Sequence, residues 1–439
     1  MKRRKIIITS FLLVLALGFL CPAGSIWAQG LRRGTYFIPE SSVEHAEDAG
    51  KRVHTNYLLS ERPETVTVLG PLGLPPDALR AIYGLPLTKD LVPGVNGGSG
   101  TIAIVAAYDY PSAAADFDTF SEKFGLPLST DNVCNGAHPC LRVVHASNLQ
   151  TTTNCSWNVE EALDMEWAHA MAPYAQIVLV LAASGNMPDV FEAVAVAGNE
   201  VVCGKMSCDS TFRLDDGKLG AISGEGAGEG EISISWGGPE FAGEADYDGY
   251  FSKLGVVYVA AIGDVGGKID YPGSSPYVVS AGGTSLHFTG TASGWAFSSE
   301  TAWADGGGGK SAYEPRPAYQ DGISVVGSAR GTPDLSFDAD PNSGPIIYDS
   351  NACYGRVGWF DVGGTSAAAP ALAGILNSSG RFYSSTANAL DMIYAAYKTA
   401  SMYSADYHDI TVGSSGPYSA GPGWDFTTGV GSPVTYSGK

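Results

Sequence analysis

Several short, continuous runs of apolar residues occur along the chain, each bounded by glycine, proline or polar residues. They cover residues 101–107, 176–182, 231–235, 256–261 and 277–279. Runs without hydrophobic alternation are typical of parallel strands that are buried on both faces of a sheet. The pattern therefore predicts five buried strands.

Stretches with helical character lie between several of these runs. Helices are expected at residues 75–83, 113–124, 159–171, 187–197 and 242–254. Alternation of strands and helices predicts the α/β class, with a parallel sheet flanked by helices on both faces. We expect one large domain over residues 71–439. Its stretch at 203–230 is rich in Gly, Ser and acidic residues, which predicts a surface insertion.

The first 28 residues have the composition of a secretory signal peptide. Four basic residues at 2–5 precede an apolar run at 6–20 and a region of small residues that ends at Ala28. A membrane anchor is the alternative, but the run is shorter than the ~20 residues that a spanning helix needs. Lipid attachment at Cys21 is disfavoured because the bulky Phe19 and Leu20 precede it. We expect a secreted protein without membrane attachment after cleavage.

The composition excludes some classes of function. Hydrophobic residues make up 44% of the 439 residues and charged residues 16%, which excludes global disorder. The formal net charge is −20, and loss of residues 1–28 would leave 21 basic against 45 acidic residues. So acidic a chain lacks the basic face that nucleic-acid binding requires. It favours an acidic working environment, where carboxylates are partly protonated.

Six cysteines remain after the signal peptide: Cys134, Cys140, Cys155, Cys203, Cys208 and Cys353. An even number in an exported chain predicts disulfides. We expect the short-range pairs 134–140 and 203–208, which leaves 155 with 353. A zinc site is the alternative, but no paired Cys-x-x-Cys or helical histidine pair accompanies these cysteines.

Residues 363–370 read Gly-Gly-Thr-Ser-Ala-Ala-Ala-Pro and precede an apolar helix at 371–376. The glycines indicate a tight strand-to-helix turn, which places Ser366 at a helix N-terminus, where N–H groups favour developing negative charge. Ser366 is therefore a candidate nucleophile, and the alternative is a helix N-cap. A serine nucleophile needs a base, and none of the seven histidines lies in a His-Gly-Thr-His type of motif.

A pair of acidic residues offers a different base. Glu160 and Asp164 are four apart, so they share a face of the expected helix, while Leu163, Trp167 and Met171 form its apolar stripe. The alternative is an ordinary solvated helix face. Two carboxyl groups so close cannot both ionise easily, so they titrate as a unit with one raised apparent pKa.

A third carboxyl group follows the strand at 256–261. Asp264 lies in a glycine turn at the carboxyl end of that strand, where α/β sheets place their sites. The alternative is a local turn in which the side chain accepts a backbone N–H.

Taken in order, Glu-x-x-x-Asp, Gly-Asp and Gly-Thr-Ser-x-x-x-Pro resemble the sedolisin family of serine-carboxyl peptidases, and the similarity runs over residues 70–433. Further matching motifs are Ile-Val-Ala-Ala-Tyr-Asp-Tyr-Pro at 104–111, Ala-Pro at 172–173, Ser-Ile-Ser-Trp-Gly at 233–237, Tyr-Pro at 271–272, Ser-Pro-Tyr-Val at 275–278, Gly-Gly-Thr at 282–284, the glycines 306–309 with Ser311, and Pro-Asp-Leu-Ser at 333–336.

The resemblance implies a subtilisin-like fold and a role for each candidate. Ser366 would be the nucleophile and Glu160 its general base, with Asp164 orienting Glu160 and sharing its proton. Asp264, protonated, would donate a hydrogen bond to the tetrahedral oxyanion. These roles agree with general chemistry, because a coupled and partly buried carboxylate accepts a serine proton best at acid pH.

The resemblance also implies one structural Ca²⁺ ion in the C-terminal region. Its ligands would be the carboxylates of Asp409 and Asp425 and the backbone carbonyls of Ile410, Gly421 and Gly423. The family usually carries a long N-terminal prodomain, whereas here residues 29–70 form a short lead-in or residual pro-segment, polar and without a sustained period.

These observations predict a secreted, calcium-binding endopeptidase that cleaves proteins or peptides at acid pH and loses activity towards neutrality. We expect a monomer. The alternative from another class is a catalytically silent relative that binds peptides or a surface partner. A neutral, subtilisin-like protease is disfavoured by the absence of a histidine motif.

Overall fold

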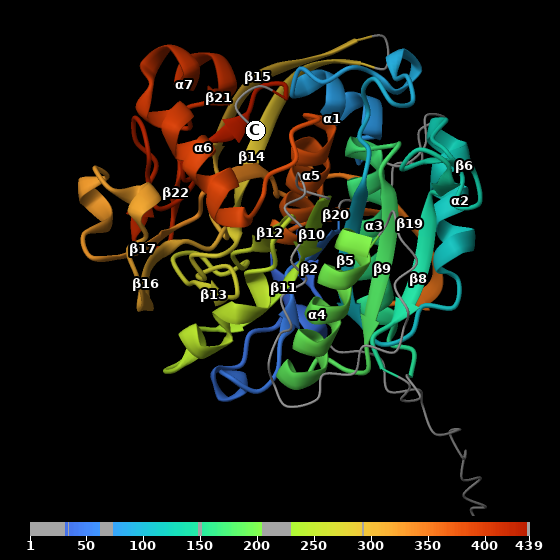
Figure 1. The fold of residues 1–439 in the computed structure, drawn as a ribbon, viewed down its shortest axis with the longest axis horizontal. Coiled ribbons are helices and arrows are strands. Elements are labelled where there is room, and N and C mark those ends of the chain that lie inside the picture. The colour runs from blue at the N-terminus through green and yellow to red at the C-terminus, as the bar shows by residue number, and fades with distance from the viewer. Residues whose placement is uncertain are drawn as a thin grey trace, which may run out of the picture.

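The computed structural model describes residues 31–33, 35–61, 73–147, 152–203, 230–291 and 294–436. Within these ranges the largest sheet has eight strands in the order β15-β14-β12-β10-β5-β9-β8, with β18 paired to β14 (Figure 1). Its strands are β5 (Thr101–Ala107), β8 (Leu141–His145), β9 (Gln176–Ala182), β10 (Gly230–Ile234), β12 (Val256–Ala261), β14 (Val279–Thr291), β15 (Gly294–Ala302) and β18 (Leu335–Asp338).

Strand pairing in this sheet is parallel except for the antiparallel hairpin of β14 and β15. Every residue of β5, β9 and β12 is buried, which explains why these strands read as continuous apolar runs. The predicted parallel sheet is confirmed.

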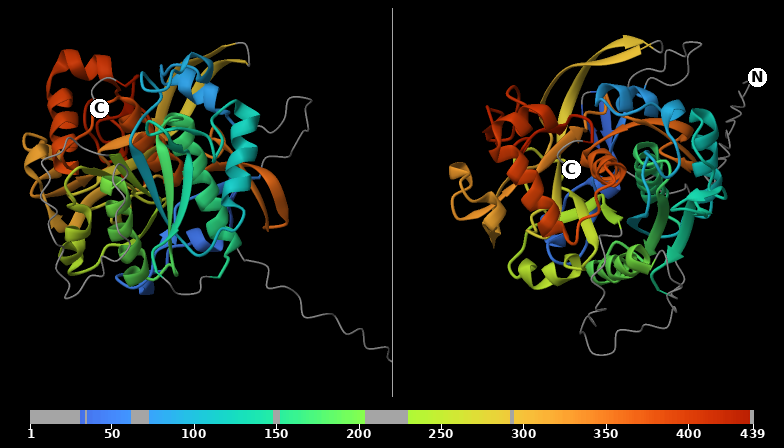
Figure 2. Two further views of the ribbon diagram at one scale, coloured as in Figure 1. Left: turned by 45° about the vertical axis from the view of Figure 1, so that its right-hand side comes forward. Right: turned by 45° about the horizontal axis from the view of Figure 1, so that its top comes forward.

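Seven α-helices accompany the described strands: α1 (Pro76–Ile82), α2 (Ala113–Phe124), α3 (Cys155–Met171), α4 (Met187–Cys203), α5 (Thr365–Ser378), α6 (Thr386–Lys398) and α7 (Ala400–Asp406). Helices α3 and α5 pack against each other on one face of the sheet, and α4 covers β5, β9 and β10 on the other (Figure 2). The prediction of helices on both faces is therefore confirmed. In the described ranges, no helix combines the length and the apolar character needed to cross a membrane.

Some element bounds differ from those expected. Helix α3 begins four residues early because the Asn154 side chain caps it, accepting the N–H groups of Ser156 and Trp157. The stretch at 242–254 forms only a 3-10 helix, Glu244–Phe251. The run at 277–279 leads into β14, whose hairpin with β15 escaped prediction because β15 is largely solvent-facing and therefore not a continuous apolar run.

The lead-in before residue 61 forms strands that pair with later parts of the chain. Its strands are β1 (Leu31–Arg33), β2 (Tyr36–Ile38), β3 (His54–Thr55) and β4 (Leu58–Ser60). Strands β1, β2 and β4 extend a sheet of order β1-β2-β4-β20-β19, where β19 is Ile346–Cys353 and β20 is Arg356–Gly363, whereas β3 pairs with β11 (Trp236–Pro239) in a separate small sheet. Tyr57, Leu58 and Leu59 are fully buried. The order of this segment comes from its partners, which a local sequence period cannot reveal.

The remaining described strands are short: β6 (Asn132–Cys134), β7 (His138–Pro139), β11 (Trp236–Pro239), β13 (Asp270–Tyr271), β16 (Gly309–Pro315), β17 (Ala329–Thr332), β21 (Tyr407–His408), β22 (Ser414–Ser415), β23 (Tyr418–Ser419) and β24 (Ser432–Pro433). They form small sheets and hairpins around the main layers.

Two of the three predicted disulfides are confirmed, Cys134–Cys140 and Cys155–Cys353. The second ties the start of α3 to the end of β19. The pair 203–208 involves Cys208, which lies outside the described residues, as do the predicted signal peptide and most of the 203–230 stretch.

Candidate active site

Ser366 is the second residue of α5, directly after the turn that follows β20. Gly364 occupies the N-cap position with φ 102°, so the interpretation of Ser366 as an N-cap is wrong. A side chain at Gly364 has no room, because its Cβ would lie 2.2 Å from the Asn56 carbonyl oxygen and 2.5 Å from Asp264 Oδ2. Glycine is thus required at this position both for its backbone conformation and for the close approach of these two groups.

The hydroxyl and the amide of Ser366 both contact the backbone of Asn56. Ser366 Oγ donates to the Ser235 carbonyl oxygen at 3.0 Å and accepts the Asn56 N–H at 3.2 Å. The Ser366 N–H donates to the Asn56 carbonyl oxygen at 2.9 Å. Ser366 is fully buried, and its N–H points from the helix N-terminus towards a carbonyl oxygen.

Glu160 and Asp164 lie on α3, which packs against α5, and both side chains are fully buried. The interpretation as a solvated helix face is therefore wrong. Burial raises the pKa of Glu160 well above its ordinary value, and the charge of Asp164 raises it further, while the nearby Ser366 hydroxyl lowers it. Burial also raises the pKa of Asp164, against the lowering effect of Ser235, whose Oγ donates to Asp164 Oδ1 at 2.5 Å.

The two carboxyl groups have free oxygen atoms facing the interior. Among the described residues, neither oxygen of Glu160 makes a hydrogen bond of ordinary geometry, and Asp164 Oδ2 has none. A buried carboxyl group without donors is most stable when it holds a proton. The pair is therefore suited to accept, share and return protons.

Asp264 follows β12, and α5 fixes its orientation. The N–H and the hydroxyl of Thr365 donate to Asp264 Oδ1 at 2.7 and 2.8 Å. Because these donors come from 101 positions further along the chain, the local-turn interpretation is wrong. Oδ2 is buried without a partner among the described residues and faces Gly364. Burial raises the pKa of Asp264 well above its ordinary value, so this carboxyl group holds a proton more firmly. Because Oδ1 already accepts two hydrogen bonds, that proton lies on Oδ2.

The structure brings the four predicted residues into one neighbourhood. The charges of Asp164 and Asp264 both raise the pKa of Glu160, and Ser366 lies close enough to lower it. Sequence reasoning missed the supporting residues Asn56, Ser235 and Thr365. Ser235 lies within the motif at 233–237 and Thr365 within the motif at 363–370, but no local pattern distinguishes Asn56.

The predicted calcium ligands gather on one C-terminal loop. The Gly423 N–H donates to both oxygens of Asp409, at 3.0 and 3.1 Å, and the Gly421 N–H donates to Asp425 Oδ2 at 2.9 Å. Ile410 follows Asp409 and is buried. The carboxylates of Asp409 and Asp425 are oxygen donors of the kind that Ca²⁺ prefers, and the same glycines that would supply backbone carbonyls hold these carboxylates through their N–H groups. Within the described ranges, no group of three or more His, Cys, Asp or Glu side chains is arranged to hold a metal.

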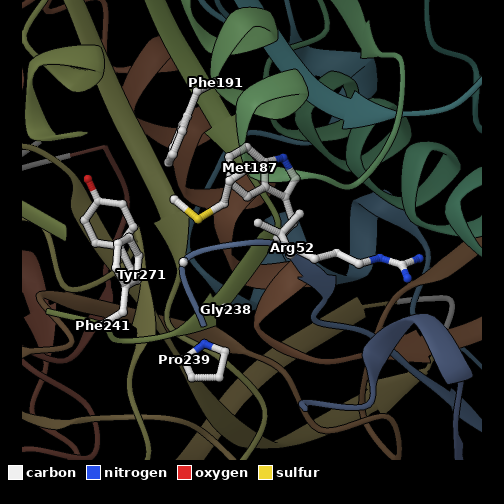
Figure 3. Close-up of a pocket in the computed structure, with 10 residues that line it drawn as sticks. Arg52, Met187, Phe191, Gly238, Pro239, Phe241 and Tyr271 are labelled. Carbon is white, nitrogen blue, oxygen red and sulfur yellow. The ribbon is translucent and has the colours of Figure 1, made fainter. Parts of the chain in front are cut away.

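A small apolar pocket borders the lead-in and β11. It is lined by Gly50, Arg52, Val53, Met187, Phe191, Trp236, Gly238, Pro239, Phe241 and Tyr271. Figure 3 shows the side chain of Phe191 beside Met187, and the guanidinium of Arg52 pointing away from the aromatic rings. The lead-in therefore supplies one wall of this pocket, and α4 and β11 supply others.

Comparisons with known proteins agree with the architecture. No protein-family model matches the chain. Kumamolisin from Bacillus sp. (strain MN-32) is 30% identical over 383 residues, covering 78% of this chain and 59% of kumamolisin. Sedolisin from Pseudomonas sp. (strain 101) is 37% identical over 180 residues, covering 38% of this chain and 29% of sedolisin. The chain thus spans less than two thirds of the length of the curated relatives that it matches.

A solved structure of Pseudomonas sedolisin, described as a serine-carboxyl proteinase complexed with two molecules of pseudo-iodotyrostatin, superposes with a TM-score of 0.60. The alignment covers 82% of this chain and 95% of that one at 22% identity, which supports the fold. The chain is thus similar to curated members of the sedolisin family and has a subtilisin-like fold.

Proposed function

We propose that this protein is a serine-carboxyl endopeptidase that hydrolyses peptide bonds at acid pH. The observation that carries the proposal is a fully buried carboxyl group, Glu160, whose pKa is raised by burial and by Asp164 and which lies beside the hydroxyl of Ser366. Similarity to kumamolisin and sedolisin supports the same reaction class.

The nucleophile in this proposal is Ser366 Oγ. It attacks the carbonyl carbon of the substrate while Glu160 accepts its proton, and Asp164 shares that proton through the coupled pair. The same proton is then delivered to the leaving amine, so the pair acts first as base and then as acid. Water hydrolyses the acyl-enzyme ester and regenerates Ser366.

The negative charge of the tetrahedral intermediate needs donors that are already in place. The Ser366 N–H at the start of α5 is one such donor, and protonated Asp264 Oδ2 is the second. The N–H and the hydroxyl of Thr365 donate to Asp264 Oδ1, which leaves Oδ2 to carry the proton. Asp264 acts only while neutral, because its ionised form would repel the developing charge.

The pH dependence follows from these raised pKa values. Asp264 is neutral at acid pH and ionises as the pH rises through its raised pKa, so activity is lost in that direction. A rate that peaks at pH 7 or above would contradict the mechanism. The proposal includes secretion, consistent with the N-terminal segment, and protein or peptide substrates.

The proposal also includes one structural Ca²⁺ ion, held by Asp409 and Asp425 with the carbonyls of Ile410, Gly421 and Gly423. When bound, the ion would cross-link the C-terminal loop by coordinating its oxygens. The catalytic steps described above use only residues of the chain.

Replacing Ser366 by alanine tests the function directly. The full chain is incubated near pH 4 with a denatured protein, and released peptides are counted by mass spectrometry. We expect S366A to lose at least about 10³-fold of the activity, because the nucleophile is removed. Ser378, at the other end of α5, provides the matched control, and S378A should retain activity. An equal signal from S366A would mean that the proteolysis comes from another enzyme, and no digestion by wild type would favour the silent, peptide-binding alternative.

A further inference from the structure

Ser235 lies between β10 and β11, at the carboxyl end of a buried strand of the main sheet. The carboxyl ends of parallel strands are where α/β sheets place their sites. The backbone carbonyl of Ser235 accepts the Ser366 hydroxyl at 3.0 Å, and its own hydroxyl donates to Asp164 Oδ1 at 2.5 Å. Ser235 is fully buried, so solvent does not compete for either bond. One residue therefore contacts both the proposed nucleophile and the acid pair.

The Ser235 hydroxyl decides which oxygen of Asp164 is available to a proton. Oδ1 already accepts this hydroxyl, whereas Oδ2 is buried without a hydrogen-bond partner among the described residues. The Ser366 carbonyl oxygen lies 3.4 Å from the same hydroxyl, but a hydroxyl has one proton to donate and the carboxyl oxygen is much closer. A proton that Asp164 shares with Glu160 therefore lies on Oδ2.

The same hydrogen bond stabilises the charged form of Asp164. Burial raises the pKa of this carboxyl group, and the donor from Ser235 lowers it, because a hydrogen bond to a carboxylate favours the anion. Helix α5, which packs against α3, carries no titratable side chain. The other titratable groups that surround the pair in the described structure are acids and one phenol: Glu161 on α3, Asp109 after β5, Asp264 after β12, Asp349 on β19 and Tyr57 of the lead-in. None of these is a cation, so the charge of Asp164 depends on the Ser235 hydroxyl.

We propose that Ser235 is a positioning residue that keeps the charge of the acid pair on Asp164 and leaves Oδ2 free for the shared proton, an inference that rests on the function proposed above. When Ser366 Oγ bonds to the substrate carbonyl carbon, its proton passes to Glu160, and the proton that Glu160 held passes to Asp164 Oδ2. The pair changes from singly charged to neutral, and it returns one proton to the leaving amine in the next step. The Ser235 hydroxyl acts on this sequence through Asp164 alone.

The consequence is a specific change in the pH–rate profile. The pair can accept a proton only while it is singly ionised, so activity falls at low pH as both carboxyl groups become protonated. Without the Ser235 donor the ionised pair is less stable and forms at a higher pH. S235A should therefore move the low-pH limb of kcat upward by about one pH unit or more. The high-pH limb, which depends on Asp264, should stay in place.

The test compares the full-length wild type with S235A, S235C and S233A. Digestion of a denatured protein is measured at saturating concentration from about pH 2 to about pH 7, and thermal unfolding of each variant shows whether it is folded. Ser233 is the matched control, because it is fully buried two positions earlier and its hydroxyl has no hydrogen-bond partner among the described residues. S233A should keep the wild-type profile. S235C retains a weaker S–H donor and should shift the low-pH limb less than S235A does.

The outcomes separate the two proposals. Active wild type together with an S235A whose low-pH limb is unchanged would overturn the role of Ser235 and leave the peptidase function standing. An equal shift in S233A would overturn it too, because the shift would then reflect altered packing of β10. If S235A does not fold, S235C decides, and an unchanged low-pH limb in that variant rejects the role. Absence of digestion by wild type at every pH would overturn the proposed function and this inference with it.

Discussion

Two groups of acidic residues, one at the active site and one on the C-terminal loop, have the same side-chain chemistry but differ in the hydrogen-bond donors that the structure gives them. In the described structure, Glu160 and Asp164 are fully buried and retain carboxyl oxygens without hydrogen-bond donors. Asp409 is exposed, and both of its oxygens accept the Gly423 N–H. Asp425 accepts four donors from Thr427 and Thr428 and a fifth from Gly421.

The difference shows how surroundings decide what a carboxyl group does. Buried without donors, it gains stability by binding a proton and becomes an acid or base that works at low pH. Supplied with N–H groups, a carboxyl group is held in place by hydrogen bonds and can organise a loop or contribute to a cation site. Substitutions in each group should therefore affect different properties, activity in the first and stability in the second.

The largest effect is expected for E160Q, which removes the base but keeps the size of the side chain. The rate of peptide hydrolysis near pH 4 should fall by about 10³-fold or more, because the glutamine amide cannot accept the proton of Ser366. Glu161 is the matched control, since it is equally buried but bonded to Asn158, at 2.9 Å. If E161Q lost as much activity as E160Q, the distinction between a proton carrier and a merely buried acid would fail.

An intermediate effect is expected at Asp264. D264A removes one oxyanion donor and should lower the rate constant by about 10²–10³-fold. D264N should lose less, because Thr365 still orients the side chain and directs the amide N–H₂ to the position of Oδ2.

The pH–rate profile makes the same test sharper. Wild type should lose activity as the pH rises through the raised pKa of Asp264, whereas asparagine stays neutral at every pH. The high-pH decline of D264N should therefore move upward relative to wild type. An unchanged high-pH decline would show that Asp264 does not carry the proton that matters.

The smallest effect is expected on the loop, where Asp409 is proposed to bind Ca²⁺. Removing calcium with a chelator should lower the melting temperature of wild type by about 3–5 °C, because the ion binds only the folded chain. D409N should show a similar loss and no further response to chelator. D391N, which replaces an exposed acid on α6, should behave as wild type. A melting temperature that chelation leaves unchanged would remove calcium from the proposal.

Much of the fold could be predicted because its central strands are buried on both faces. β5 and β12 have the expected bounds, since a strand with no exposed side must be apolar throughout. β15 was missed because its largely solvent-facing residues do not form such a run. The candidate site residues could be selected from local patterns. Ser366 lies in a glycine turn before a helix, and Glu160 and Asp164 share a helix face on which no basic residue is placed to pair with them.

The sequence by itself determined the α/β class, the sedolisin resemblance and which four residues are candidates, because these depend on local spacing and residue type. Only the tertiary structure decided that Glu160 and Asp164 are buried, that Thr365 orients Asp264, and that Asn56 lies against Ser366. Each of these contacts joins segments more than 70 residues apart, or depends on how helices pack. Burial and pairing of this kind are properties of the assembled chain, and they raise the pKa of Glu160, Asp164 and Asp264.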